Sequence, residues 1–163
     1  MRLSTREEFD SAPEAVFAVI RDEAFQRAKC EATSTGEYAA SVTEQGERTL
    51  VRTERRLPSD GLPDVARSFV GDVLTVVEVQ DWGPADPDGS RRCRVDLHIT
   101  GAPLTLKGEA LLAPGGRGAL ETLEADLKAN VPFIGGKIER AAAEPILAAV
   151  ALEGETLRDF LAR

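Results

Sequence analysis

The longest helical pattern in the chain lies at its C-terminal end. Between Ile134 and Arg163, apolar residues recur every three or four positions and charged residues fall mainly between them. A helix of roughly 28 residues spans ~40 Å, about the width of a small domain. The pattern therefore predicts one long helix whose small side chains fill little of the volume beneath it, so that either backbones approach closely or a space remains. The small residues in its middle are Ala141, Ala142, Ala143, Ala148, Ala149, Ala151 and Gly154.

The N-terminal part predicts one strand followed by two short helices. Arg2–Phe9 alternates weakly between polar and apolar residues and is expected to form the strand. Ser11 as the N-cap and Pro13 in the first turn predict the start of the first helix. Asp22 is expected to cap a second helix over Glu23–Lys29.

Between positions 32 and 131 the pattern changes to strands separated by turns that contain Gly and Pro. Positions 121–130 also fit helical spacing. Five consecutive apolar–polar alternations, with a hairpin turn before them and Pro132 after them, favour a strand. One or two helical turns are expected at Asp64–Val70. The other predicted strands are Thr33–Thr43, Arg48–Leu57, Asp72–Trp82, Arg91–Thr100 and a strand that begins at Leu104.

These elements predict an α+β fold. About seven antiparallel strands joined by hairpin-length loops form a sheet with one apolar face, and that face must be covered. Only the C-terminal helix is long enough to cover it. The length of 163 residues fits a single domain over 1–163. Pro145 lies within the long helix and removes a backbone hydrogen bond, so a kink or a division is expected there.

The order of elements resembles the START-like (SRPBCC) superfamily, which includes birch-pollen-allergen-like proteins and polyketide cyclases. Positions 9–17, FDSAPEAVF, are similar to the opening of that superfamily, where a small residue and Pro lead into an apolar helix. Positions 131–139, VPFIGGKIE, resemble the strand-to-helix junction of an uncharacterised bacterial branch. The resemblance implies a helix-grip fold, with a cavity between sheet and helix that often holds lipids, sterols or polyketides. Both motifs form junctions and neither is catalytic, so they support the fold more than an activity.

Composition narrows the choice of partners. The net charge is −8 and the pI is near 4.8, which argues against nucleic acid as the main partner because phosphate binding needs a cationic surface. Cys30 and Cys93 lie far apart without metal-ligand spacing and predict free thiols in a reducing compartment. No signal peptide or spanning apolar segment is seen, so a cytoplasmic protein without integral membrane contact is expected, as a monomer or homodimer.

Candidate catalytic chemistry is sparse. The single histidine, His98, shares the predicted outer face of its strand with Asp96 and is expected at the surface. One histidine and two scattered cysteines make a metal site improbable, and no cofactor or catalytic residue is assigned.

Polar residues on two strands are the remaining candidates. Arg52 and Glu54 share one face with Leu50, and Glu78 and Gln80 share another with Trp82. If these faces are interior, their charges must pair or bind the polar end of a ligand; if they are exterior, the side chains are solvated. The sequence leaves this choice open.

The leading hypothesis is a domain that binds a small hydrophobic or amphipathic molecule as a carrier or sensor, without catalysis. One alternative is an enzyme of the cyclase, dehydratase or hydrolase type that uses Arg52, Glu54 or Glu78. Another is a protein-interaction module that binds through the sheet or through Leu57–Val70. The expected cavity-lining residues are Leu50, Arg52, Glu54, Leu74, Val76, Trp82, Val95, Leu97, Leu106, Leu123, Leu127, Ile138, Ala142, Ile146 and Ala149.

Overall fold

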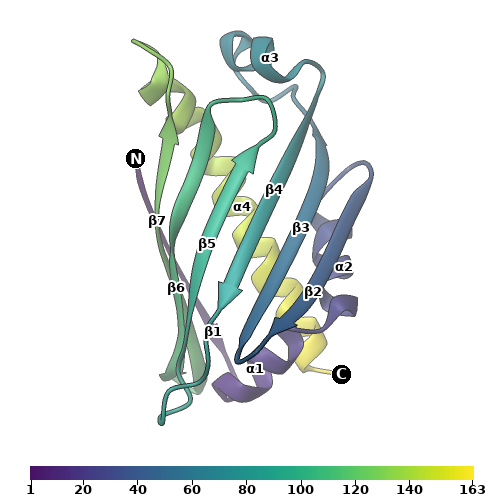
Figure 1. Cartoon of the computed structure of the whole chain (residues 1–163), viewed down its shortest axis with the longest axis vertical. Helices are drawn as coiled ribbons and strands as arrows, with labels where there is room; N and C mark the ends of the chain where they lie inside the picture. The colour runs from purple at the N-terminus through teal and green to yellow at the C-terminus, as the bar shows by residue number, and fades with distance from the viewer.

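The computed structural model describes residues 1–163 and consists of a seven-stranded sheet and four helices (Figure 1). The predicted α+β helix-grip class is confirmed. The elements, in chain order, are β1 (Arg2–Phe9), α1 (Pro13–Ile20), α2 (Glu23–Thr33), β2 (Tyr38–Gln45), β3 (Arg48–Pro58), α3 (Asp64–Val70), β4 (Val73–Trp82), β5 (Arg91–Ile99), β6 (Leu104–Gly115), β7 (Gly118–Ala129) and α4 (Gly135–Leu161).

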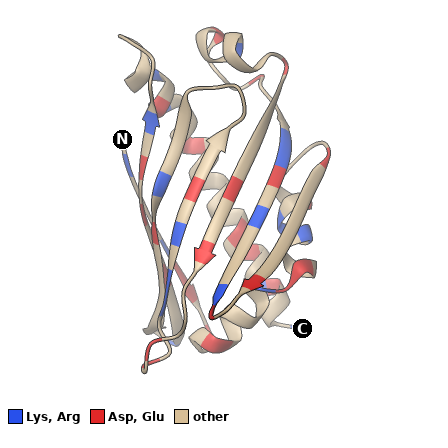
Figure 2. Ribbon diagram, viewed as in Figure 1, with Lys and Arg blue, Asp and Glu red and all other residues tan.

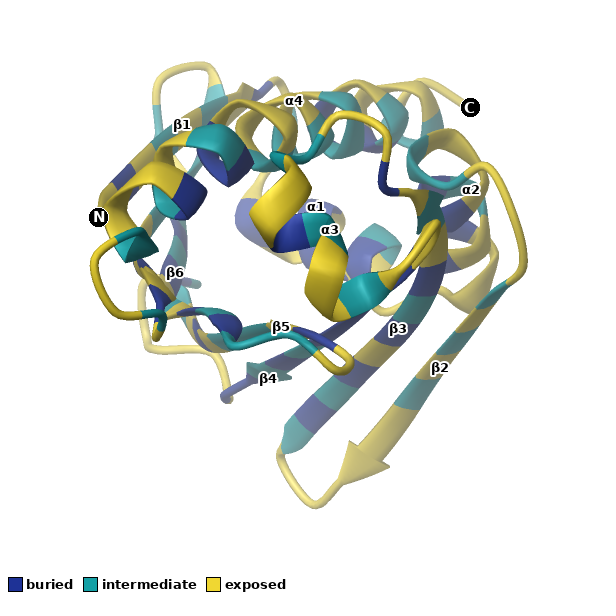
Figure 3. Ribbon diagram, turned by 90° about the horizontal axis from the view of Figure 1, so that it is seen from above, coloured by how far each residue is buried: buried dark blue, intermediate teal, exposed yellow.

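The sheet is antiparallel throughout, in the order β1-β7-β6-β5-β4-β3-β2. Hairpins join β2 to β3 and each pair of neighbours from β4 to β7, as the turn signals predicted. β1 pairs with β7, so α1 and α2 carry the chain across to β2 at the opposite edge. Seen from above, the sheet curves around α4, and α3 lies across the near end of the space that they enclose (Figure 3).

Two apolar clusters fill the two ends of this space. The cluster near α3 is built around the upper halves of β4 to β7 and the first turns of α4, and includes Leu106, Leu127 and Ile138. The cluster near α1 contains the aromatic residues Phe9 and Trp82, together with other side chains of α1, the strands and the end of α4. The interior between the clusters is partly polar, and this middle region positions the candidate site.

Two local predictions near the N-terminus are wrong. Ala12, not Ser11, is the N-cap of α1, and no side chain caps this helix. The second helix runs to Thr33 instead of Lys29, and the Thr33 hydroxyl donates a 2.7 Å hydrogen bond to the Lys29 carbonyl one turn earlier. The strand predicted over Thr33–Thr43 therefore begins later and runs from Tyr38 to Gln45. The predicted cap of α2 is confirmed, since Asp22 accepts a 2.8 Å hydrogen bond from the Ala24 amide.

The long helix follows the prediction at both ends, and the division that was one of the two outcomes expected at its proline does not occur. It is continuous from Gly135 to Leu161, and Pro145 lies inside it without dividing it. At Gly154 the absence of a side chain on α4 leaves room for the Glu7 side chain of β1, because a Cβ atom there would lie 2.8 Å from a carboxylate oxygen of Glu7. None of the helices is both long and apolar enough to cross a membrane.

Acidic and basic side chains are interspersed along the strands and helices (Figure 2). Many of those on the outer face of the sheet pair with a neighbouring strand, for example Arg94 with Asp81 at 2.9 Å. His98 is exposed on this face, as predicted.

Candidate functional site

A band of buried polar side chains crosses the interior between the two apolar clusters. Lys29 is only 1% exposed, and Arg55, Glu78 and Gln80 are each less than 9% exposed. Charged groups are rarely buried unless they are paired. Alternation explains why the strand residues point inward: Arg55 is in phase with the buried Val51 of β3.

The buried charges form one connected network. An Arg55 nitrogen donates to Glu78 Oε2 at 2.9 Å, and the Lys29 ammonium lies 3.6 Å from Glu78 Oε1 and 3.3 Å from Glu153 Oε1. Arg55 also donates to the Thr33 hydroxyl at 2.9 Å. The network therefore joins α2, β3, β4 and α4 and balances two cations against two carboxylates.

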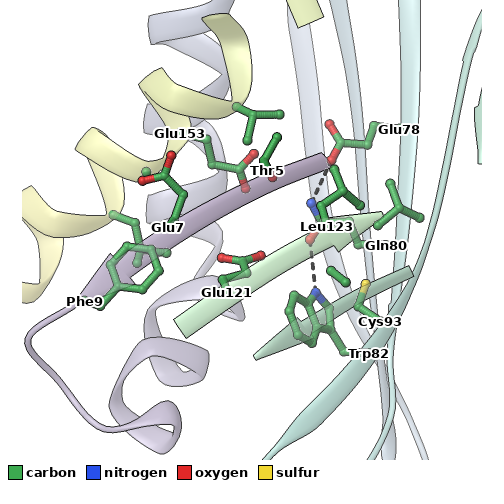
Figure 4. A pocket seen from close by; sticks show the side chains of 15 residues that line it. Thr5, Glu7, Phe9, Glu78, Gln80, Trp82, Cys93, Glu121, Leu123 and Glu153 are labelled. Carbon is green, nitrogen blue, oxygen red and sulfur yellow. Dashed lines mark hydrogen bonds between the residues drawn. The ribbon is translucent and has the colours of Figure 1, made fainter. Parts of the chain in front are cut away.

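Glu78 extends this network along β4. Its Oε1 accepts a 2.7 Å hydrogen bond from the Gln80 amide, and the Gln80 oxygen accepts a 3.0 Å bond from the Trp82 indole (Figure 4). The three side chains are two residues apart and share the inner face. The relay orients the polar edge of the buried Trp82 ring toward the middle of the molecule.

The network changes the pKa values of its members. Burial acts to raise the pKa of Glu78, but the charges of Lys29 and Arg55 outweigh it and hold that pKa below its usual value. Burial raises the pKa of Glu153, against the opposing charge of Lys29. Burial acts to lower the pKa of Lys29, but Glu153 and Glu78 together raise it. Lys29 and Glu78 are thus held in their charged forms.

A cavity lies next to this network, between α4 and the inner face of the sheet. Its volume is about 60 Å³, which is space for roughly four water molecules. Its wall is apolar toward the α1 end and polar toward the network, and Figure 4 shows the side chains that surround it. The lining residues are Thr5, Glu7, Phe9, Glu78, Gln80, Trp82, Cys93, Val95, Ala110, Glu121, Leu123, Val150, Glu153, Gly154 and Leu157.

Glu121 is the polar lining residue with the most unusual surroundings. Its side chain extends from β7 into the cavity (Figure 4) and makes no hydrogen bond or ion pair with the protein. Burial, with a smaller contribution from the negative charge of Glu153, raises the pKa of Glu121 to about 8. At neutral pH the carboxyl group therefore remains largely protonated and has hydrogen-bonding capacity that no protein group uses.

A second, smaller space of about 20 Å³ lies near α3. Nearly all of its lining is apolar and comes from α3, the turn between β5 and β6, and the start of α4, including Phe69, Pro103 and Ile138. It contains no charged side chain and offers no group for chemistry.

The predicted cavity-lining residues occupy four different places. Trp82, Val95 and Leu123 line the cavity. Ala149 is half-buried on α4. Leu50, Arg52 and Glu54 lie on the outer face of β3. The remaining eight belong to the apolar cluster near α3 or pack against it, and they are Leu74, Val76, Leu97, Leu106, Leu127, Ile138, Ala142 and Ile146.

The interior interpretation of the polar strand residues is correct for β4 and wrong for β3. Glu78 is buried with Gln80, whereas Arg52 and Glu54 form a half-exposed surface pair 3.2 Å apart. The reason is the phase of β3, whose buried residues are the odd-numbered ones from Thr49 to Arg55.

Sequence reasoning missed Lys29, Arg55, Glu121 and Glu153, although a signal existed for each. Glu121 and Arg55 are in phase with the apolar residues of their strands. Lys29 and Glu153 each lie one helical turn from a buried apolar residue. Charged residues are normally assigned to solvent, and only the three-dimensional pairing shows that these four face inward.

The family comparisons agree with the fold. The model of a family described as a protein of unknown function (DUF2505) matches residues 4–161. An uncharacterized protein of Mycobacterium tuberculosis is 33% identical over 92 residues, which cover 55% of this chain and 52% of that protein. The chain thus matches only about half the length of its curated relatives.

Solved structures share the architecture at low sequence identity. The STAR-related lipid transfer protein of Xanthomonas axonopodis superimposes with a TM-score of 0.59 at 16% identity, over 99% of this chain and 85% of that one. The Zhui aromatase/cyclase of Streptomyces sp. R1128 gives a TM-score of 0.57 at 11% identity, over 100% and 93%. The START-like resemblance is confirmed at the level of the fold, and function does not follow from the fold alone.

Proposed function

The chain belongs to the family of unknown function DUF2505, and we propose that it binds a small amphipathic molecule in the cavity between the sheet and α4. In this proposal residues 1–163 act as one cytoplasmic domain that carries or senses the ligand without transforming it. The observation that carries the proposal is the cavity itself, which combines an apolar wall with a buried polar network and the unpartnered Glu121 carboxyl group. Such a combination of apolar surface and a few polar groups is typical of small-molecule sites.

The cavity also limits the ligand. Space for roughly four water molecules admits a small molecule or the polar end of a larger one. A whole lipid, sterol or polyketide would require α4 to move away from the sheet. The printed names of the similar structures, a lipid transfer protein and an aromatase/cyclase, support ligand binding in this fold and leave the ligand of this chain open.

The first test is native mass spectrometry of the protein purified from its own host, followed by denaturation and small-molecule analysis of the same sample. The proposal expects a bound organic molecule that is released on denaturation. Trp82 provides a second readout, because it is the only tryptophan and its ring lines the cavity. Adding the released molecule back to refolded protein is expected to change the Trp82 fluorescence at a one-to-one ratio. A protein that carries no bound molecule, or a released molecule that leaves the Trp82 fluorescence unchanged when it is added back, would contradict the proposal.

A second candidate function is an acid–base enzyme of the cyclase, dehydratase or hydrolase type. The specific observation in its favour is Glu121, a cavity carboxyl group whose pKa is raised to about 8 and which can therefore donate a proton near neutral pH. The two functions differ in what happens to the ligand. An enzyme would release a compound of altered mass, and Glu121→Gln would abolish the change, whereas a carrier returns the compound unaltered.

A further inference from the structure

The charged lining of the cavity is entirely acidic. Four of its lining residues are glutamates, namely Glu7, Glu78, Glu121 and Glu153, and none is a lysine or arginine. The cations of the network lie outside the lining, behind the carboxylates that they neutralise. An anionic ligand would therefore meet carboxyl groups without a compensating positive charge.

Three of the four glutamates are already paired by the protein. Glu7 accepts a 2.6 Å hydrogen bond from Arg158. Glu78 is held by Arg55 at 2.9 Å, and Glu153 by Lys29 at 3.3 Å. None of these three needs a ligand to balance its charge.

Glu121 is the exception, and titratable side chains from several strands and helices surround it. Burial has the largest effect on its pKa and raises it. The negative charges of Glu153 on α4, Glu7 on β1 and Glu78 on β4 raise this pKa further. The positive charge of Lys29 on α2 lowers it, but by less than burial raises it. The Cys93 thiol on β5 also faces this region, and burial raises its pKa, so it adds no charge at neutral pH. Glu121 is half-buried, and a cation placed beside it would allow it to ionise with a partner for its charge.

We propose that the ligand carries a positively charged amine or ammonium group, and that this group pairs with Glu121. The inference rests on the proposed function, since it names the chemical class of the ligand in the same cavity. The rest of the ligand lies against the apolar wall formed by Trp82, Val95 and Leu123. The Trp82 ring also offers an aromatic face to a nearby cation.

The test compares three four-carbon probes that differ only in their polar end: n-butylamine, 1-butanol and butanoate. Each is titrated into the protein at pH 9, where Glu121 is mostly ionised and butylamine is still protonated, while Trp82 fluorescence is recorded. We expect butylamine to bind at least about tenfold more tightly than either of the others, because a charge-assisted hydrogen bond in a desolvated site contributes that much.

The pH dependence provides an independent readout. Butylamine resembles a lysine side chain and stays protonated up to pH 9. Because only the ionised form of Glu121 pairs with it, and that form grows from a minor to the major fraction as pH passes 8, its apparent affinity is expected to rise about tenfold between pH 7 and pH 9. Butanol binding is expected to stay constant over this range.

Two matched variants locate the effect. Glu121→Gln keeps the size of the side chain and is expected to abolish both the preference for butylamine and its pH dependence. Glu124→Gln makes the same change on the exposed face of β7, where Glu124 pairs with Arg2 at 3.2 Å, and is expected to leave both unchanged.

The outcomes separate the two proposals. If butanol or butanoate binds as tightly as butylamine, or if Glu121→Gln keeps the preference, the cationic ligand is overturned and the proposed cavity binding stands. If none of the three probes changes the fluorescence and no molecule copurifies with the protein, both proposals are overturned.

Discussion

At the scale of single residues, Glu78 is the side chain on which the buried polar contacts converge. It is bonded to Arg55 and Gln80 and lies next to Lys29, on the buried face of β4. Apart from Glu78, the Arg55 side chain donates a hydrogen bond only to the Thr33 hydroxyl, and its Nε has no hydrogen-bond partner. Because a buried charge costs much more free energy unpaired than paired, the stability of the middle of the molecule depends on this one carboxylate.

Glu78→Gln is therefore expected to lower the free energy of unfolding by about 3 kcal/mol, since it leaves Arg55 buried without its counter-ion. Urea denaturation followed by circular dichroism measures the change. Glu54→Gln on the neighbouring strand is the matched control. Its pair with Arg52 is nearly half exposed, so its loss is expected to cost less than about 1 kcal/mol. Equal losses in the two variants would show that the buried network contributes no more than a surface pair.

Glu121 makes stability depend on pH in the direction opposite to that of a salt-bridged carboxylate. Its folded pKa of about 8 lies above the value of ~4.3 for an unfolded glutamate. Between these two values the folded state keeps a proton that the unfolded state has lost. The stabilisation is therefore complete below the unfolded pKa and is lost as pH rises through the folded pKa.

The measurable quantity is the difference in unfolding free energy between the wild type and Glu121→Gln, determined by urea denaturation at several pH values. Between pH 5 and pH 8.5 we expect the unfolding free energy of the wild type to fall by about 2 kcal/mol relative to that of Glu121→Gln. This value is reduced to allow for screening by water in the cavity. Parallel curves for the two proteins would contradict a protonated Glu121 in the folded state at neutral pH.

At the scale of elements, β6 and β7 approach each other closely at Gly108. A Cβ atom on Gly108, in the middle of β6, would lie 2.5 Å from the Cα atom of Ala125 and would also collide with the Glu124 carbonyl oxygen. Both obstacles belong to the backbone and cannot move aside as a flexible side chain would. Glycine in a strand interior often marks such a close approach.

Gly108→Ala is expected to destabilise the protein by about 2–3 kcal/mol, because the two strands must separate to admit the methyl group. Thermal unfolding followed by circular dichroism tests this. Gly61→Ala in the loop before α3 is the control. Nothing lies within 4 Å of a Cβ atom there, so we expect a change of less than about 1 kcal/mol, in either direction. A Gly108→Ala variant as stable as the control would contradict the close approach.

At the scale of the whole molecule, the cavity is a consequence of how the two ends are filled. Large apolar side chains complete the cluster near α1, and aliphatic side chains complete the one near α3. In between, α4 contributes Val150, Glu153, Gly154 and Leu157 to the lining, and these side chains together with those of the sheet leave a space unfilled. Of the small residues that predicted a space, only Gly154 borders it, and the space is much smaller than a lipid.

The sequence by itself determined the elements, their order and the covering of the sheet by the last helix. Alternation of apolar and polar residues was sufficient for β4 to β7, including the segment 121–130 that also fitted a helix. It also placed Glu78 on the same face as Trp82. These properties are local, because a strand's two faces and a helix's apolar stripe follow from residue spacing alone.

The tertiary structure alone decided which face of β3 is buried, which charges meet in the interior, and how large the cavity is. Lys29 and Glu153 are 124 residues apart, and neither residue's neighbours in the sequence indicate the other. Spacing assigns residues to a face, but the side on which that face lies depends on the curvature of the sheet and on the helix that packs against it. A charged residue that is in phase with apolar residues can be assigned to the interior only when its ion-pair partner is known, because burying a charge without a partner costs much free energy.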